Sequence, residues 1–384
     1  MSLETPPAEV VLSRQASPNL LTLVYSSPVF KRLRHIRQLG ALMYVDPAAN
    51  HTRADHSRGT ADLVREVFEV LDAKCPPTGA GRCPERLQSL AAVAGACHDL
   101  GHGPYSHEFD HFLAGFMPAD FPFLDHEARS IMLTQHILRD HLTQVEMEVV
   151  CSLIDPKRHH WPGAVSAECA LPVVFNDGGG DIELYKLKEA QRLVPWTAAW
   201  VRHLISAPDK VRPDVDRLDY IVRDSRALNL AGVKLLEDAR AAFLEDCAVV
   251  DGEWVPSSPR GREAQHVLME QRRLNFAHIY QAPATAGVSA ALREKLQQEY
   301  GCDVGWWTRT LSDPLAFCAL HEKTHTDLFE RVPSLRSEVA GGGPGSSSSG
   351  VPAEYRAFDA RLAMYNERHS HISPPTLALN DPKN

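Results

Sequence analysis

The stretch that decides the fold is His98-Asp99-Leu100-Gly101-His102-Gly103-Pro104-Tyr105-Ser106-His107. An adjacent histidine and aspartate close a predicted helix, and the glycines that follow are typical of a helix end. Imidazole nitrogen combined with carboxylate oxygen suits iron, manganese, zinc or nickel better than calcium, which prefers oxygen ligands. A His-Asp pair alone is weak evidence for a metal, because such pairs occur by chance at helix ends. The stretch therefore indicates part of a metal site whose other ligands lie elsewhere in the chain.

His56 and Asp216 can supply those other ligands. His56 opens a predicted helix within Arg53-Ala54-Asp55-His56-Ser57, and Asp216 begins another within Asp214-Val215-Asp216-Arg217-Leu218-Asp219-Tyr220. We therefore expect one transition metal (Fe, Mn, Zn or Ni) on His56, His98, Asp99 and Asp216. A bound metal of this kind lowers the pKa of water to about 7, which makes water a nucleophile at neutral pH.

Composition is that of an ordinary globular protein. The chain has 384 residues, 44% of them hydrophobic and 23% charged, which is enough for one large core or two modest ones. The net charge of −9 argues against a broad basic face that coats nucleic acid. Eight cysteines without a CxxC pair indicate neither a zinc ribbon nor a disulfide framework. With no signal peptide and no apolar run of about 20 residues, we expect a cytoplasmic or nuclear protein without membrane association.

Hydrophobic spacing predicts helices along most of the chain. The first buried face is formed by Leu63, Val64, Val67, Phe68 and Leu71, and the second by Leu87, Leu90, Val93, Ala94 and Cys97. Further helices are expected over 105–116, 125–138 and 145–154, and another starts at Pro213-Asp214. Because strand-like alternation is scarce, the predicted fold class is mostly α, with small β or irregular additions.

Three regions are expected. Residues 1–25 form an N-terminal segment, and residues 26–335 form a single domain with an insertion near 156–181. Residues 336–384 form a low-complexity linker and a mobile tail, because glycines and serines dominate their start.

Four motifs, taken together, carry a family resemblance. They are Arg32-Leu33-Arg34-His35-Ile36-Arg37-Gln38-Leu39-Gly40, the His56 motif, the His98 stretch and the Asp216 motif, and they occur in that order. This set resembles the HD core of the deoxynucleoside triphosphate triphosphohydrolases, most closely the vertebrate SAM-and-HD-domain enzyme, without its sterile-alpha-motif domain. The match covers roughly Ser26 to Gln281. It implies an HD-domain helical fold, a homo-oligomer (dimer or tetramer), and release of a deoxynucleoside and intact triphosphate.

The resemblance also implies catalytic roles for four residues. His107 is the favoured general acid, and Asp110, three residues later on one helix, would orient it and raise its pKa. His126 is the second candidate, and His102 would meet the phosphates. Without the resemblance, the simpler interpretation is that His107 and Asp110 pair on a solvated helix.

Substrate contacts carry over in the same way. The phosphates, alone or as a Mg²⁺ complex, would meet Arg53, Arg217 and Arg272, and Tyr220 would stack against the sugar. Gln38 and Asp224 match positions that hold the 3′-hydroxyl, while Leu39 and Tyr280 match residues that crowd the 2′ carbon and exclude ribose. For Leu39 and Tyr280, ordinary core packing is the alternative explanation.

The chain departs from the family pattern in places. Arg217 stands where the vertebrate enzyme has lysine, while Ser26 and Ala282-Pro283 replace residues that hold a guanine-nucleotide activator, so we expect weak activation or none. Two other functions stay open: an HD-type phosphatase for nucleoside monophosphates or other phosphoesters, and a nucleotide- or nucleic-acid-binding protein that retains the fold. The acidic net charge disfavours nucleic acid as the partner.

Overall fold

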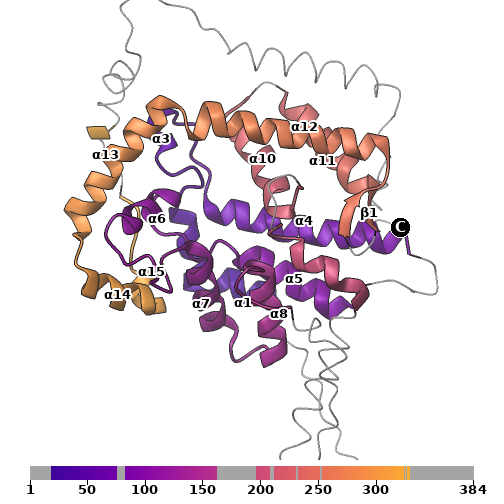
Figure 1. Cartoon of the computed structure of the whole chain (residues 1–384), viewed down its shortest axis with the longest axis horizontal. Coiled ribbons are helices and arrows are strands. Elements are labelled where there is room, and N and C mark those ends of the chain that lie inside the picture. Colours follow the sequence, from indigo (N-terminus) through magenta and orange to yellow (C-terminus); the bar gives the residue numbers. More distant parts are fainter. Residues whose placement is uncertain are drawn as a thin grey trace, which may run out of the picture.

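The computed structural model describes residues 19–75, 83–161, 196–207, 212–230, 232–250, 253–323, 325 and 327–328. The start of the N-terminal segment, most of the predicted insertion, and the predicted linker and tail lie outside these residues. The prediction of a mostly helical fold with a small β addition is confirmed (Figure 1). No helix in the described ranges has the length and apolar character needed to cross a bilayer.

The elements of the N-terminal half are α1 (Leu20–Ser26), α2 (Pro28–Arg32), the 3-10 turn η1 (Leu33–His35), α3 (Leu42–Val45), α4 (Arg53–Ala73), α5 (Glu85–Cys97), α6 (His107–Ala114), α7 (His126–Leu138) and α8 (Gln144–Ile154). After them come η4 (Trp196–His203), α10 (Val215–Ala227), α11 (Val233–Asp246), β1 (Cys247–Val250), β2 (Glu253–Pro256), α12 (Pro259–Asn275), the π-helical turn η5 (Phe276–Tyr280), α13 (Pro283–Tyr300), α14 (Val304–Ser312) and α15 (Pro314–Cys318). Strands β1 and β2 form an antiparallel hairpin in which Cys247 faces Pro256. Leu20 and Val24 on α1 are buried, so the folded body begins before Ser26.

Helix α4 runs through the middle of the molecule, with α5 packed on one side and α10 on another (Figure 1). It begins where Thr52 and Asp55 form a capping box, in which each side chain accepts a hydrogen bond from the other residue's backbone N–H. This cap fixes the first turn, and His56 lies in that turn. The predicted helix start is therefore confirmed, with His56 facing the protein interior at 1% exposure.

Small residues let α5 approach α4 closely. A Cβ atom at Gly95 would lie 3.3 Å from backbone atoms of Ala61 on α4, which is tighter than ordinary van der Waals contact. His98 follows directly after the last residue of α5. The close approach therefore brings the end of α5, with its histidine and aspartate, beside the start of α4.

The turn between α5 and α6 contains two residues in an unfavourable conformation. Tyr105 and Ser106 have φ angles of 64° and 58°, in the left-handed region that non-glycine residues rarely adopt. Two hydrogen bonds hold them there: Ser106 Oγ donates to Arg37 O at 2.6 Å and Tyr105 Oη to Lys323 O at 2.5 Å. Helix α6 consequently starts at His107, two residues later than the spacing predicted.

Gly101 allows the same turn to lie against the start of α7. A Cβ atom there would be 2.1 Å from His126 O and 2.4 Å from Ser130 N. These are backbone atoms, so they cannot move aside as a flexible side chain would. The contact sets how far His126 stands from the His98 stretch.

We predict that Gly101→Ala destabilises the protein by about 3 kcal/mol or more, because overpacking against backbone forces α7 to shift. The matched control is Gly305→Ala on α14, where the nearest atom would be 3.4 Å away, so the change should be neutral or stabilise by up to about 1 kcal/mol. Urea unfolding of both variants measures the difference. Equal stability of the two would contradict the tight packing at Gly101.

Candidate active site

The four expected metal ligands converge from three elements. His56 Nε2 lies 2.9 Å from Asp216 Oδ1 and 3.2 Å from His98 Nε2. His98 Nε2 lies 3.5 Å from Asp216 Oδ1, and Asp99 carboxylate oxygens lie 3.5 Å from each of the two histidines. Ligands that share one metal at about 2.1 Å stand roughly 3 Å apart, so this spacing suits one ion. His56, His98 and Asp216 form a group that could hold one metal ion, and Asp99 lies beside it. Two nitrogens with carboxylate oxygens fit a transition metal, and the identity of that metal stays open.

Outer contacts orient these side chains. His56 Nδ1 bonds Asp219 Oδ2 at 2.8 Å, and His98 Nδ1 donates to Gly95 O at 2.8 Å, which leaves both Nε2 atoms directed at the metal position. Asp219 is itself held by Arg223 through bonds of 2.7 and 2.9 Å. Gly59 on α4 makes room for this pair, since a Cβ there would be 2.1 Å from both side chains.

Asp219 had no role in our sequence interpretation. It stands one helical turn after Asp216 on α10, so the two carboxylates share a face. That spacing was the available signal, because a histidine ligand usually donates its second ring nitrogen to a carboxylate or carbonyl.

Arg53 differs from the expectation that it meets substrate phosphates. It is 4% exposed, and its NH1 donates to Asp99 at 2.6 Å, its Nε to Ser106 Oγ at 2.9 Å and its NH2 to Gln38 O at 3.2 Å. Each guanidinium nitrogen therefore makes a bond to the protein, and these bonds use three of the five N–H donors. Arg53 is the first residue of α4, and its guanidinium group neutralises and orients the carboxylate of Asp99.

The predicted pairing of His107 with Asp110 is wrong. Asp110 Oδ2 bonds His126 Nδ1 at 2.9 Å, and Asp110 Oδ1 accepts from Arg129. Sequence spacing brings His107 and Asp110 onto one helix, but a side chain of α7 takes the carboxylate. Burial alone would lower the pKa of His126, yet the hydrogen bond and charge of Asp110 outweigh it and raise that pKa to about 9.

His107 and His102 lie beside His126 as neutral rings. Burial, reinforced by the positive charges of Arg53 and His126, holds the pKa of His102 well below its usual value. Desolvation and the same two charges lower the pKa of His107, but its surface is exposed, so the effect of desolvation on it is smaller. The His102 ring stacks on His126 with centroids 4.0 Å apart. One ring nitrogen of each histidine and a carboxylate oxygen of Asp110 lie within 4.8 Å of one another, close enough for a metal ion, but His126 and Arg129 already bond to Asp110. The cluster of His102, His107 and His126 is better suited to an anion than to a second metal.

Arg217, Arg272 and Tyr220 lie near the metal ligands but contact the protein. Arg217 NH1 donates to Arg212 O at 2.6 Å and lies 3.2 Å from Asp214. Arg272 Nε donates to Tyr220 Oη at 2.6 Å. The ring of Tyr220 stands 6.4 Å from that of His56, which places it beside the metal position.

Of the four expected sugar-binding residues, Asp224 and Tyr280 contact each other, and Gln38 and Leu39 are neighbours in the chain. Asp224, 1% exposed, accepts from Tyr280 Oη at 2.5 Å. The buried Oε1 of Gln38 has no hydrogen-bond partner in the described structure, which is typical of an atom that awaits a ligand or water. Leu39 is half-buried beside Gln38. Tyr280 lies on the π-helical turn η5, a feature often found at functional sites.

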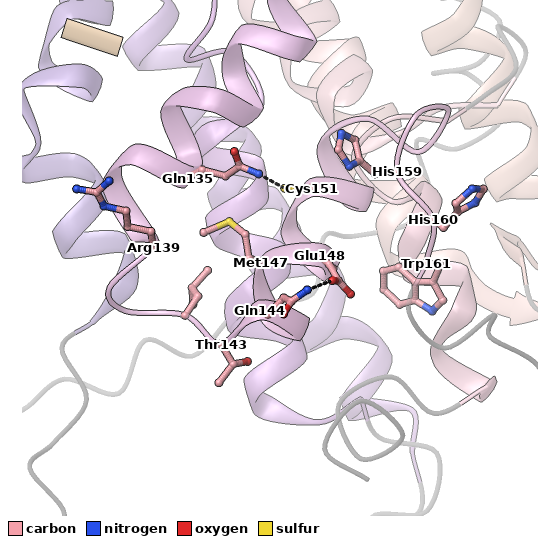
Figure 2. A pocket seen from close by; sticks show the side chains of 11 residues that line it. Gln135, Arg139, Thr143, Gln144, Met147, Glu148, Cys151, His159, His160 and Trp161 are labelled. Atoms are coloured by element: carbon pink, nitrogen blue, oxygen red, sulfur yellow. Dashed lines mark hydrogen bonds between the residues drawn. The ribbon is translucent and has the colours of Figure 1, made fainter. Parts of the chain in front are cut away.

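A pocket of about 650 Å³ lies elsewhere, between α7, α8 and the turn after α8. Figure 2 shows its lining, which includes Gln135, Arg139, Met147 and Trp161. None of the candidate ligands or substrate-binding residues lines it. This pocket therefore does not hold the candidate reactive groups, whereas a smaller one of about 240 Å³ is lined by Gly59, Asp219 and Arg223.

Comparison with known proteins agrees with this geometry. Residues 53–221 match the HD domain family model. The deoxynucleoside triphosphate triphosphohydrolase SAMHD1 of Homo sapiens is 38% identical over 131 residues, which are 34% of this chain and 20% of that protein. Its homolog in Dictyostelium discoideum is 31% identical over 229 residues, 59% of this chain and 37% of that protein. An HD domain-containing protein of Acanthamoeba polyphaga mimivirus, L394, is 32% identical over 215 residues, 52% of this chain and 38% of that protein.

The segment 53–221 is therefore similar to the HD domain family. Part of the chain is also similar to the SAMHD1 triphosphohydrolases. The chain spans less than two fifths of the length of each relative named here.

We predict that Asp219→Ala weakens metal binding by about 10–100-fold, because His56 loses the acceptor that fixes its ring and tautomer. Asp238→Ala is the matched control, since Asp238 lies on α11 and pairs with Lys234 at the surface. Titration of the metal-free proteins with Mn²⁺ or Zn²⁺ measures both affinities. If Asp219→Ala binds as tightly as the control, the outer contact does not tune the metal site.

Asp110→Asn should lower the pKa of His126 from about 9, because burial remains while the hydrogen bond and the charge of Asp110 are lost. The raised pKa stabilises the folded protein below pH 6.5, and this contribution is lost as pH rises through 9. Between pH 6.5 and 9, the free energy of unfolding should therefore fall less in the variant than in the wild-type protein. NMR titration of labelled histidines, assigned with His126→Gln, checks the shift, and an unchanged His126 titration would refute the pairing.

Proposed function

We propose that this protein is a metal-dependent phosphohydrolase that cleaves deoxynucleoside triphosphates to deoxynucleoside and triphosphate. The observation that carries the proposal is the position of Asp99 between two groups of side chains. Its Oδ1 lies 3.5 Å from His98 Nε2 and 3.2 Å from His102 Nε2. His98 belongs to the metal set, which is His56, His98, Asp99 and Asp216, and His102 belongs to the histidine cluster. One phosphate group can therefore contact a metal and the cluster at the same time.

The histidine cluster supplies the groups that phosphoester hydrolysis needs. When bound, a transition metal at His56, His98, Asp99 and Asp216 would activate water and polarise a phosphoryl oxygen. His126, kept protonated by Asp110, is the proposed proton donor to the leaving oxygen. His107 and His102 would bind the phosphate, and the approach of that anion would raise their lowered pKa values. Relative to the sequence interpretation, the favoured acid moves from His107 to His126.

Sugar selection is proposed for Gln38, Leu39, Asp224 and Tyr280. The hydrogen bond from Tyr280 Oη to Asp224 fixes the phenol ring, so a group at the 2′ position would meet a side chain that cannot swing away. Shape rejection of a small group is worth roughly 10–200-fold in kcat/KM. Assembly as a dimer or tetramer, and a Mg²⁺ ion with the phosphates, stay predictions from the resemblance.

A phosphatase acting on nucleoside monophosphates is the second candidate. The favouring observation is that Arg53, Arg217 and Arg272 all bond to the protein, which leaves fewer free guanidinium groups for the β- and γ-phosphates. A single phosphate could be held by the histidine cluster alone.

Product analysis tests the proposal. Metal-loaded protein incubated with each of the four deoxynucleoside triphosphates should release inorganic triphosphate and the deoxynucleoside, resolved by anion-exchange chromatography. His126→Asn should lower kcat by about 10²–10⁴-fold and still bind metal, because positioned proton transfer contributes on that scale. His98→Ala should lose both metal and activity.

Other products identify other reactions. Pyrophosphate with a monophosphate would show cleavage between the α- and β-phosphorus. Phosphate released only from nucleoside monophosphates would establish the second candidate. A loss of less than tenfold in His126→Asn, with a larger loss in His107→Asn, would return the acid role to His107.

A further inference from the structure

His51 holds the carboxylate that is proposed to bind the sugar. Its Nε2 lies 2.7 Å from Asp224 Oδ1, while the other oxygen, Oδ2, accepts from Tyr280. The side chains of His51 and Asp224 are 12% and 2% exposed, so water screens this contact weakly. Asp224 is thus fixed from two sides, by the loop before α4 and by η5.

The backbone of His51 also holds Gln38. Gln38 N donates to His51 O at 3.0 Å, next to the isolated β-bridge between Arg37 and Thr52. His51 therefore joins both residues to which we assign the 3′-hydroxyl. Two buried atoms at this junction lack hydrogen-bond partners in the described structure: Nδ1 of His51 and Oε1 of Gln38.

We propose that His51 is a positioning residue for recognition of the 3′-hydroxyl group. This inference rests on the proposed function. Its imidazole N–H holds Asp224 in the rotamer that receives the hydroxyl, and its carbonyl holds the strand-like segment that carries Gln38. His51 lies outside the metal set and the histidine cluster, so it acts on the sugar and not on the phosphate chemistry.

The remaining hydrogen-bonding capacity supports this assignment. A carboxylate accepts about four hydrogen bonds, and His51 and Tyr280 use two of them, so Asp224 can still accept from a ligand hydroxyl. With Nε2 as the donor to the Asp224 carboxylate, Nδ1 of the same imidazole tautomer is left as an acceptor.

A pair of substrates that differ only in the 3′-hydroxyl isolates the effect. We would measure kcat and KM with dTTP and with 2′,3′-dideoxy-TTP. In His51→Ala, kcat/KM for dTTP should fall by about 10–100-fold, mostly through KM, because the bond to a charged partner is lost. The loss of kcat/KM with the dideoxy substrate should stay below about threefold. The ratio of kcat/KM for dTTP to that for the dideoxy substrate should therefore fall.

Three controls separate positioning from general damage. His51→Gln, whose amide N–H can reach Asp224, should recover most of the preference. Asp224→Asn combined with His51→Ala should be little worse than Asp224→Asn alone, since both act on one contact. Mn²⁺ affinity of His51→Ala should equal that of the wild type, because the metal set is untouched.

Equal losses with both substrates in His51→Ala would overturn the proposal, as would additive effects in the double variant. These outcomes differ from failure of the proposed function. If the wild-type protein releases no triphosphate from any deoxynucleotide, the function itself fails, whereas an active wild type with an unchanged hydroxyl preference in His51→Ala refutes only the role of His51.

Discussion

The buried carboxylate of Asp99 is the group on which the rest of the site depends. It is 3% exposed and accepts from Arg53 at 2.6 Å, and this cation keeps the pKa of Asp99 well below its usual value despite burial. An unpaired charge at this depth would be strongly destabilising, so Arg53 is required before any metal or substrate arrives. Arg53 can fill this role only because the capped start of α4 meets the end of α5 there, and the strained turn at Ser106 supplies its second contact.

The metal set could be predicted from sequence, whereas the partners around it could not. His56, His98, Asp99 and Asp216 stand at helix ends within recognisable motifs, and helix ends are positions that local signals locate well. The i, i+3 spacing gave the wrong partner for Asp110 because it considers only residues on one helix. Helix α7 is not included in that comparison, and it brings His126 and Arg129 to the same carboxylate. Tertiary contact decided the pairing.

The direction of long side chains could not be predicted from the sequence either. Arg53 was expected to reach outward to phosphates, but its position at the first residue of α4 aims it at Asp99 and Gln38. His51 carried no motif that would single it out, and its role emerges only when the loop before α4 is seen against α10. The predicted fold class needed none of this information, because periodic burial along α4 and α5 suffices for it.

The site contains buried cations in a protein whose net charge is −9. Arg32, Arg53 and Arg129 are all buried around the His98 stretch, and Arg32 NH2 donates to the carbonyls of Leu100 and His102 at 2.7 and 2.8 Å. Of these three cations, Arg53 meets Asp99 and Arg129 meets Asp110, while Arg32 meets backbone carbonyls. A charge in a low-dielectric interior acts more strongly than one at the surface, so a few buried guanidinium groups can attract a polyphosphate without a basic face. The acidic surface would then disfavour nucleic acid, while the interior favours a small anion that can enter.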